Sequence, residues 1–270
     1  MKIVSFNVNS VRLRLHQLAA VIEKHQPEFI GLQETKVQDH DFPLQDIEQL
    51  GYQAIFMGQK THYGVALLSR LPCGDAQYGF PGDDEEAQKR FIGGRFEIEG
   101  ADWYIYNGYF PQGEARDHPV KFPAKSAFYR DLTGFLRQRH AATDRVVVMG
   151  DYNIAPQDND IGIGADNARR WLKTGKTSFL PEEREWFSTL CGLGLHDGFR
   201  LVHPAEDNLF SWFDYRSRGF EREPRRGLRI DHLLVADALK PAVHDAGIDY
   251  DIRGMTKPSD HAPVWIELTP

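Results

Sequence analysis

The stretch Val146-Val147-Val148-Met149-Gly150-Asp151-Tyr152-Asn153 places an apolar run directly before a carboxylate and an amide. A short run of β-branched and other apolar residues is typical of a buried strand. Such a strand fixes its backbone, while the loop that follows leaves polar side chains free to meet others. The stretch therefore predicts a buried strand over residues 146–149 with candidate functional groups at its end.

Other apolar runs have the same character and are expected to form strands: residues 3–8, 29–32, 54–57, 65–68, 103–106, 230–235 and 263–268. Helical periodicity lies between them, over residues 15–22 and 128–136, and Pro181 is a good first residue for a third helix. Strands and helices mix throughout, and no linker-like segment divides the chain. We expect one catalytic domain over residues 1–270, α/β in class, with sheet packed against outer helices.

Composition excludes several classes of protein. The chain has 270 residues, of which 41% are apolar and 26% charged, so it can bury a core. No apolar run reaches the ~18 residues that a membrane span needs, and polar residues come too early for a signal peptide. The two cysteines exclude a disulfide framework and a Cys-rich metal site, and we expect a cytoplasmic protein.

The charge distribution is uneven. The formal net charge of −7 argues against a protein that holds nucleic acid by bulk positive charge. Residues 212–230 nevertheless contain six arginines against three acids, which suits either a local basic surface or a solvated loop.

Carboxylates and amides recur at or near the ends of the predicted strands. Besides the stretch quoted above, the fragments are Ser5-Phe6-Asn7, Gly31-Leu32-Gln33-Glu34-Thr35, Ile105-Tyr106-Asn107-Gly108-Tyr109, Leu228-Arg229-Ile230-Asp231 and Ser259-Asp260-His261-Ala262-Pro263. A single Asn or Asp at such a place is more often a turn former or a helix cap. Their repetition favours a functional site built from strand ends.

The polar residues of these fragments suit hydrolysis at a hard metal ion. The set is Asn7, Glu34, Tyr109, Asp151, Asn153, Asp231, Asp260 and His261. It includes no serine or cysteine in a nucleophile elbow or dyad, which favours direct attack by water. Oxygen ligands select Mg²⁺ or Mn²⁺ over zinc, and phosphate ester hydrolysis is the natural reaction of such a set.

One apparent motif is rejected. Lys173-Thr174-Gly175-Lys176-Thr177 looks like half of a phosphate-binding P-loop. No glycine stands five residues before Gly175, and no apolar strand leads into the segment.

Eight stretches, in order along the whole chain, resemble bacterial exonuclease III. They are Ser5-Phe6-Asn7-Val8-Asn9, Gly31-Leu32-Gln33-Glu34-Thr35-Lys36, His62-Tyr63-Gly64-Val65-Ala66-Leu67-Leu68, Asn107-Gly108-Tyr109-Phe110-Pro111-Gln112-Gly113-Glu114, Met149-Gly150-Asp151-Tyr152-Asn153-Ile154, Ser211-Trp212-Phe213-Asp214-Tyr215-Arg216, Gly227-Leu228-Arg229-Ile230-Asp231 and Ser259-Asp260-His261-Ala262-Pro263-Val264. The resemblance implies a two-sheet β-sandwich flanked by helices, of the endonuclease/exonuclease/phosphatase superfamily. It also implies a Mg²⁺-dependent DNA repair enzyme, with Mn²⁺ as a substitute and duplex DNA as partner. Such an enzyme cuts 5′ to abasic sites, removes 3′-phosphate and other 3′ blocks, and degrades duplex DNA from 3′ ends; we expect it to act as a monomer away from membranes.

The resemblance implies a metal site and a group of water-orienting residues. Glu34 would be the main metal ligand, with Asn7 beside it and Asp260 close to the metal or its waters. Asp151, also placed near the metal, would align or activate the attacking water, and Asn153 would help to hold that water and the phosphate.

Further roles concern the phosphate and the DNA. Asp231 would orient His261, which together with Tyr109 would contact the scissile phosphate. Residues matching positions that enter, line or contact the DNA are Gln112, Lys121, Trp212, Arg216, Arg225 and Arg226.

The sequence departs from the family pattern in three places. Ser10-Val11-Arg12 stands where the family usually has Gly-Leu-Arg, which alters the backbone freedom of a loop near DNA. Residues 219–227 form a slightly longer segment than usual. His232 replaces an apolar residue that is common in close relatives, and we interpret it as a structural variant rather than a second catalytic imidazole.

Rival interpretations come from two classes. One is another enzyme of the superfamily, either an inositol lipid phosphatase or a secreted nonspecific nuclease. The missing signal peptide and disulfide pair weaken the secreted nuclease, and the stretches around Gln112 and Trp212 disfavour a lipid head-group site. The other is a nucleic-acid-binding regulator that has lost catalysis, which should lack some of the eight polar residues; all eight are present.

Overall fold

Side-chain alternation along the strands sets the architecture. In the strand that begins at residue 145, Val147 and Met149 face one apolar cluster, while Val146 and Val148 face another. The first cluster lies between two sheets, and the second lies under helices. A strand buried on both faces has a continuous apolar sequence. This explains why residues 146–149 contain no polar side chain.

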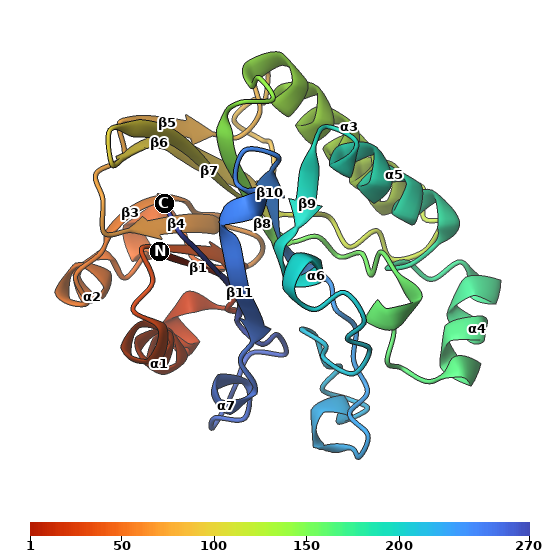
Figure 1. Cartoon of the computed structure of the whole chain (residues 1–270). Helices are drawn as coiled ribbons and strands as arrows, with labels where there is room; N and C mark the ends of the chain where they lie inside the picture. Colours follow the sequence, from red (N-terminus) through yellow and green to blue (C-terminus); the bar gives the residue numbers. More distant parts are fainter.

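The computed structural model describes residues 1–270 as two facing six-stranded sheets with helices on the outside (Figure 1). Sheet A has the order β11 (Val243–Ile248), β12 (Val264–Leu268), β1 (Lys2–Asn7), β2 (Phe29–Gln33), β4 (Val65–Ser69) and β3 (Gln53–Met57). Sheet B has the order β5 (Asp75–Tyr78), β6 (Phe91–Ile98), β7 (Ala101–Tyr109), β8 (Arg145–Asp151), β10 (Asp231–Ala236) and β9 (Leu195–Asp197). The predicted sandwich flanked by helices is confirmed.

Helices cover the outer face of each sheet. Helices α1 (Leu15–His25) and α2 (Leu44–Gln49) pack on sheet A, and α3 (Lys121–Arg139) and α5 (Pro181–Cys191) pack on sheet B. The remaining helices are α4 (Ala165–Thr174), α6 (Gly198–Val202) and α7 (Tyr250–Arg253). None of the helices has the length and apolar character that a membrane crossing requires.

The predicted strands and helices are present, with shifted ends and several additions. β10 begins at Asp231 rather than at residue 230, and β12 begins at Val264 rather than at residue 263. Helix α3 begins at Lys121, seven residues before the periodic run, and it accommodates Pro123 in its first turn, where backbone N–H groups have no helical partner.

Two long strands were missed for identifiable reasons. β6 contains Gly93 and Gly94, which interrupt its apolar run; a Cβ atom at Gly93 would lie 2.3 Å from the Tyr106 ring. β11 contains His244 and Asp245, and its pairing with β12 is irregular at this point. In both strands a local irregularity of the sheet removes the sequence pattern.

Close backbone approach fixes the register of β7 and β8 beside their polar ends. Gly108 pairs with Gly150, and a Cβ atom at Gly150 would lie 2.0 Å from the Gly108 carbonyl oxygen. The next pair along the same ladder is Tyr109 with Asp151. The glycines therefore allow the spacing that places a phenol and a carboxylate side by side.

Candidate active site

The polar strand ends of both sheets meet at one cavity of about 240 Å³. The register of sheet B sets Asp151 beside Tyr109 on one side and opposite Asp231 on the other. Of the eight predicted polar residues, those that line the cavity are Glu34, Tyr109, Asp151, Asn153, Asp260 and His261. Asn7 and Asp231 are buried and contact lining residues from behind.

One amide links the two sheets at this cavity. Asn7 Nδ2, at the end of β1, donates to Glu34 Oε1 and to Asp151 Oδ2, both at 2.9 Å. The amide oxygen of Asn7 accepts from the backbone N–H of Asn9 at 3.0 Å. The amide thus presents its nitrogen to both carboxylates and uses its oxygen in the following loop.

The Glu34 carboxylate is held in its charged form. Burial alone would raise its pKa, but Lys36 and Asn7 outweigh burial, so the pKa of Glu34 lies below its usual value. Lys36 Nζ lies 2.7 Å from Glu34 Oε2. Glu34 itself adopts a positive φ of 53°, which turns the chain out of β2 and points the carboxylate into the cavity.

His261 forms a buried pair with Asp231. The distance from His261 Nδ1 to Asp231 Oδ2 is 2.8 Å, and His261 Nε2 lies 3.7 Å from Asp151 Oδ2. Burial alone would lower the pKa of His261, but the carboxylates of Asp231 and Asp151 raise that pKa to about 10. The ring is therefore an imidazolium at neutral pH, with both nitrogens acting as donors.

The Asp151 carboxyl has a raised pKa. Burial raises its pKa, His261 opposes the rise, and the charges of Asp231 and Glu34 reinforce it, which brings the pKa of Asp151 to about 7. Such a group exchanges a proton near neutral pH, which is the property that a general base needs. Two carboxylates that face one space also repel each other, and a cation between them relieves that repulsion.

Tyr109 remains a neutral hydroxyl. Burial and the carboxylates of Glu34 and Asp151 raise its pKa well above the usual value for tyrosine. The Arg90 guanidinium lies 4.6 Å from the centroid of the Tyr109 ring and 4.2 Å from that of Tyr63. Tyr109 is thus held by stacking and can act only as a hydrogen-bond donor or acceptor.

A buried lysine holds Asn153 and the neighbouring loops in place. Lys125 Nζ donates to the carbonyl oxygen of Asn153 at 2.8 Å and to Glu183 Oε1 at 2.5 Å. Glu183 Oε2 in turn accepts from the backbone N–H groups of Ser178 and Leu180 at 2.8 Å. Two segments that line the cavity, at Asn153 and at Ser178, are therefore tied to one fully buried ion pair, which was not predicted from the sequence.

The donor set fits a hard divalent cation. One oxygen or nitrogen atom from each of Glu34, Asp151 and His261 lies within 4.8 Å of the others. Two carboxylates are what Mg²⁺ usually takes from a protein, and a protonated His261 would not be a ligand. Glu34 and Asp151 could thus hold the ion, while Asp260 faces Asn9 and Trp212 through both oxygens.

Trp212 belongs to the cavity wall. Its Nε1 donates to Asp260 Oδ2 at 3.1 Å, and its side chain is only partly buried. The flanking Phe210, Ser211 and Phe213 are buried. Gln112 also lines the cavity, where its Nε2 donates to Thr177 Oγ1 at 3.0 Å.

The predicted DNA-contact cations lie outside this cavity. Lys121 is exposed and pairs with Glu114 at 2.5 Å. Arg216 and Arg226 line a neighbouring cavity, whereas Arg225 stacks on the rings of Phe220 and Tyr250. Their roles stay predictions.

Four lining residues were not predicted as site residues: Trp171, Lys176, Ser178 and Ile230. Lys176 belongs to the segment, residues 173–177, that was rejected as a P-loop candidate. The rejection of the P-loop agrees with the structure, because this segment ends a helix instead of following a strand. The lysine reaches the cavity because residue 176 pairs with Ala115, a long-range contact without a local signal.

The departures from the family pattern have structural counterparts. Ser10 has a φ of 92°, a conformation that favours glycine and strains serine. His232 is buried, with one ring nitrogen 3.0 Å from Arg229 Nη1 and the other 2.9 Å from the Ile154 carbonyl oxygen. Arg229 also pairs with Asp160 and Asp197, so His232 completes a buried polar network behind the site.

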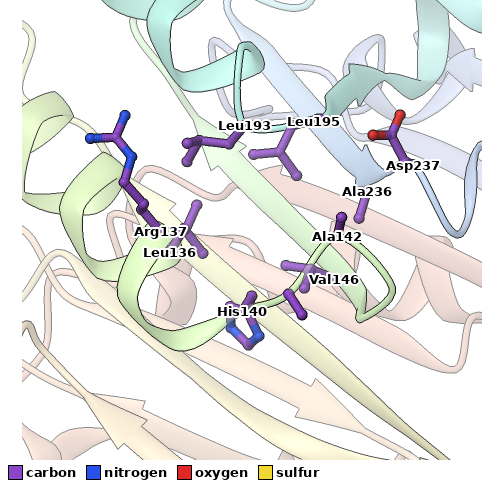
Figure 2. Close-up of a pocket in the computed structure, with 11 residues that line it drawn as sticks. Leu136, Arg137, His140, Ala142, Val146, Leu193, Leu195, Ala236 and Asp237 are labelled. Atoms are coloured by element: carbon purple, nitrogen blue, oxygen red, sulfur yellow. The ribbon is translucent and has the colours of Figure 1, made fainter.

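A further cavity, of about 210 Å³, lies at the opposite end of β8 and β10 (Figure 2). Most of its lining is apolar, with Leu136, Val146, Leu193 and Leu195 facing the space. Its one imidazole, His140, is already bonded to Tyr106 and Asp144. This cavity has no pair of facing carboxylates and is not a candidate catalytic site.

Comparisons with known proteins agree with this geometry. Residues 4–261 match the Endonuclease/Exonuclease/phosphatase family. The chain is 54% identical to exodeoxyribonuclease III of Haemophilus influenzae, over 99% of this chain and 100% of that protein. It also matches, over the full length of both chains, a 3′ phosphatase from Neisseria bound to a product DNA hairpin (37% identity, TM-score 0.89) and an AP endonuclease from Archaeoglobus fulgidus (31% identity, TM-score 0.89).

Replacing Lys125 by methionine should destabilise the protein strongly. The substitution leaves the Glu183 carboxylate buried without its partner, and breaking a buried pair in this way costs about 3 to 5 kcal/mol. Urea denaturation of Lys125→Met and of the control Lys121→Met checks this, since Lys121 is an exposed cation one turn away on the same helix. Equal stability of Lys125→Met and wild type would show that the pair does not hold the loops.

Proposed function

Because the chain belongs to the Endonuclease/Exonuclease/phosphatase family, we propose that the cavity around Glu34, Asp151 and His261 is the active site of a DNA repair nuclease. The enzyme is a phosphoric diester hydrolase of the exodeoxyribonuclease III class, in a family that depends on metal ions. The observation that supports this site best is the meeting of two carboxylates, one from each sheet, with a buried imidazolium at one cavity.

The metal ion in this proposal is Mg²⁺, with Mn²⁺ as a substitute. Glu34 and Asp151 would hold it, with Asn7 fixing the two carboxylates and Asp260 facing the same cavity. When bound, such an ion neutralises charge on phosphoryl oxygens and lowers the pKa of water. The full charge of Glu34 and the mutual repulsion of the two carboxylates support this assignment.

The protein's own side chains supply the remaining chemistry. Asp151 orients the attacking water and accepts its proton on a carboxylate oxygen. His261, held by Asp231, donates from Nε2 to the scissile phosphate, and Tyr109 donates from its hydroxyl.

Asn153 completes the group of donors around the phosphate. Its Nδ2 donates to the carbonyl oxygen of Phe110 at 2.9 Å, and its backbone N–H donates to Asp151 Oδ1 at 3.0 Å. The residue adopts a positive φ of 52°, which asparagine tolerates better than most residues. Its side chain is thereby fixed beside Asp151, where it helps to hold the water and the phosphate.

The proposed substrates are duplex DNA with abasic sites, 3′-blocked ends or plain 3′ ends. Exodeoxyribonuclease III, a 3′ phosphatase and an AP endonuclease are among the relatives, and each activity is hydrolysis of a DNA phosphate ester. The proposed DNA-contact residues are Gln112, Lys121, Trp212, Arg216, Arg225 and Arg226. We also propose that residues 1–270 act as one catalytic domain and as a monomer in the cytoplasm.

A panel of labelled duplexes tests the activity. The panel contains an abasic site, a 3′-phosphate and a plain recessed 3′ end, each with Mg²⁺ and with EDTA. We expect cleavage of all three with Mg²⁺ and none with EDTA, because nothing then offsets the charge at the leaving oxygen. Undiminished cleavage in EDTA would exclude the metal site.

Asp151→Asn should keep DNA binding and lose the chemical step. The amide preserves shape but cannot accept the proton of water, and general base catalysis commonly contributes about 10²- to 10⁴-fold. Single-turnover cleavage at saturating enzyme measures the rate, and fluorescence anisotropy measures binding. A variant that retained more than about a third of the rate would remove Asp151 as the base.

A further inference from the structure

A second cavity, of about 340 Å³, adjoins the catalytic cavity and shares a wall with it. The shared wall consists of Trp171, Lys176 and Trp212. Helix α4 and the arginine-rich segment that follows Trp212 form the rest of this second cavity. The two cavities are therefore separated by one layer of side chains.

The second cavity is strongly cationic. Its lining contains one acid, Asp214, against five cations: Arg170, Lys176, Arg216, Arg222 and Arg226. None of these five forms an ion pair with a carboxylate. In a protein with a net charge of −7, five unneutralised cations around one space favour a bound anion.

Lys176 is held at the boundary between the two cavities. Its backbone N–H donates to the Trp171 carbonyl oxygen at 2.9 Å, and its Nζ lies 3.8 Å from the centroid of the Trp171 ring. The Trp171 ring also packs parallel to Phe179, with centroids 5.6 Å apart. Trp171 thus serves as a platform for the ammonium group and is poorly placed to stack on a base.

We propose that the second cavity is a phosphate subsite for the phosphodiester adjacent to the scissile phosphate, with Lys176 as the residue that determines its occupancy. The inference rests on the proposed function, because it takes the catalytic cavity to hold the scissile phosphate. Neighbouring phosphates of one strand are joined by a single nucleotide, so a strand that crosses the shared wall brings its next anion to the free cations.

The subsite acts on binding more than on chemistry. Lys176 holds a phosphate whose charge does not change during the reaction, so its contact is equal in the ground and transition states. Lys176→Met should therefore raise KM about ten-fold, which is the loss expected for one charge-assisted hydrogen bond, and leave kcat within about three-fold of wild type. Lys173→Met is the matched control, since Lys173 lies on α4 but lines neither cavity.

Replacing single DNA phosphates by uncharged groups tests where the subsite lies along the strand. The substrate is an abasic duplex in which one phosphate at a time, on either side of the scissile bond, is replaced by an uncharged methylphosphonate. The wild type should lose kcat/KM about ten-fold at one adjacent position, and Lys176→Met should lose nothing further at that position. Lys173→Met should behave as the wild type throughout.

Two results would overturn the subsite. One is a loss of kcat/KM by methylphosphonate substitution that adds to the loss by Lys176→Met at every position. Lys176 would then act through the overall positive potential and not on one phosphate. The other is a wild-type loss on removal of the neighbouring base but not on neutralisation of the phosphate, which would assign the cavity to a base. Failure of the proposed function would look different, because the wild type would then not cleave the unmodified duplex with Mg²⁺.

Discussion

The rest of the site depends on the Asn7 amide, which holds a carboxylate of sheet A and a carboxylate of sheet B on one nitrogen atom. A second buried amide stabilises the same junction: Asn107 of β7 donates to backbone carbonyls of β2 and β4 and accepts from Gln33 at 2.6 Å. A Cβ atom at Gly31 would lie 2.8 Å from Asn107 Oδ1, so the glycine makes room for this contact. Buried polar groups without partners are costly, and these amides therefore fix how the sheets register against each other.

This junction sets the electrostatics of the cavity. Glu34, Asp151 and Asp231 are gathered around His261, and burial strengthens every interaction among them. The His261 imidazolium pairs with Asp231, and the Lys36 ammonium group pairs with Glu34. Burial raises the pKa of Asp151 to about 7 although His261 opposes the rise, and the charges of Asp231 and Glu34 reinforce it, so a cation fits beside this carboxylate.

The strands and polar strand ends of the site are encoded in local sequence patterns and could be predicted from them. The apolar runs that precede Glu34 and Asp151 indicated buried strands, and the structure brings their polar ends to one cavity. Lys125 and Lys176 escaped prediction because their importance comes from partners far along the chain, Glu183 for one and Ala115 with Trp171 for the other. β6 escaped prediction because Gly93 and Gly94 interrupt its apolar run, and these glycines make room for the side chains of Tyr106 and Cys73.

Binding of Mn²⁺ without DNA tests the central claim most directly, namely that one carboxylate from each sheet holds the metal. Electron paramagnetic resonance of free Mn²⁺ would measure the affinity of the wild type, of Glu34→Gln and Asp151→Asn, and of Asp84→Asn as an exposed control. We expect both cavity variants to bind Mn²⁺ at least about ten-fold more weakly than the wild type and the control, since loss of even a supporting group commonly costs that much. Wild-type affinity in both cavity variants would contradict that claim.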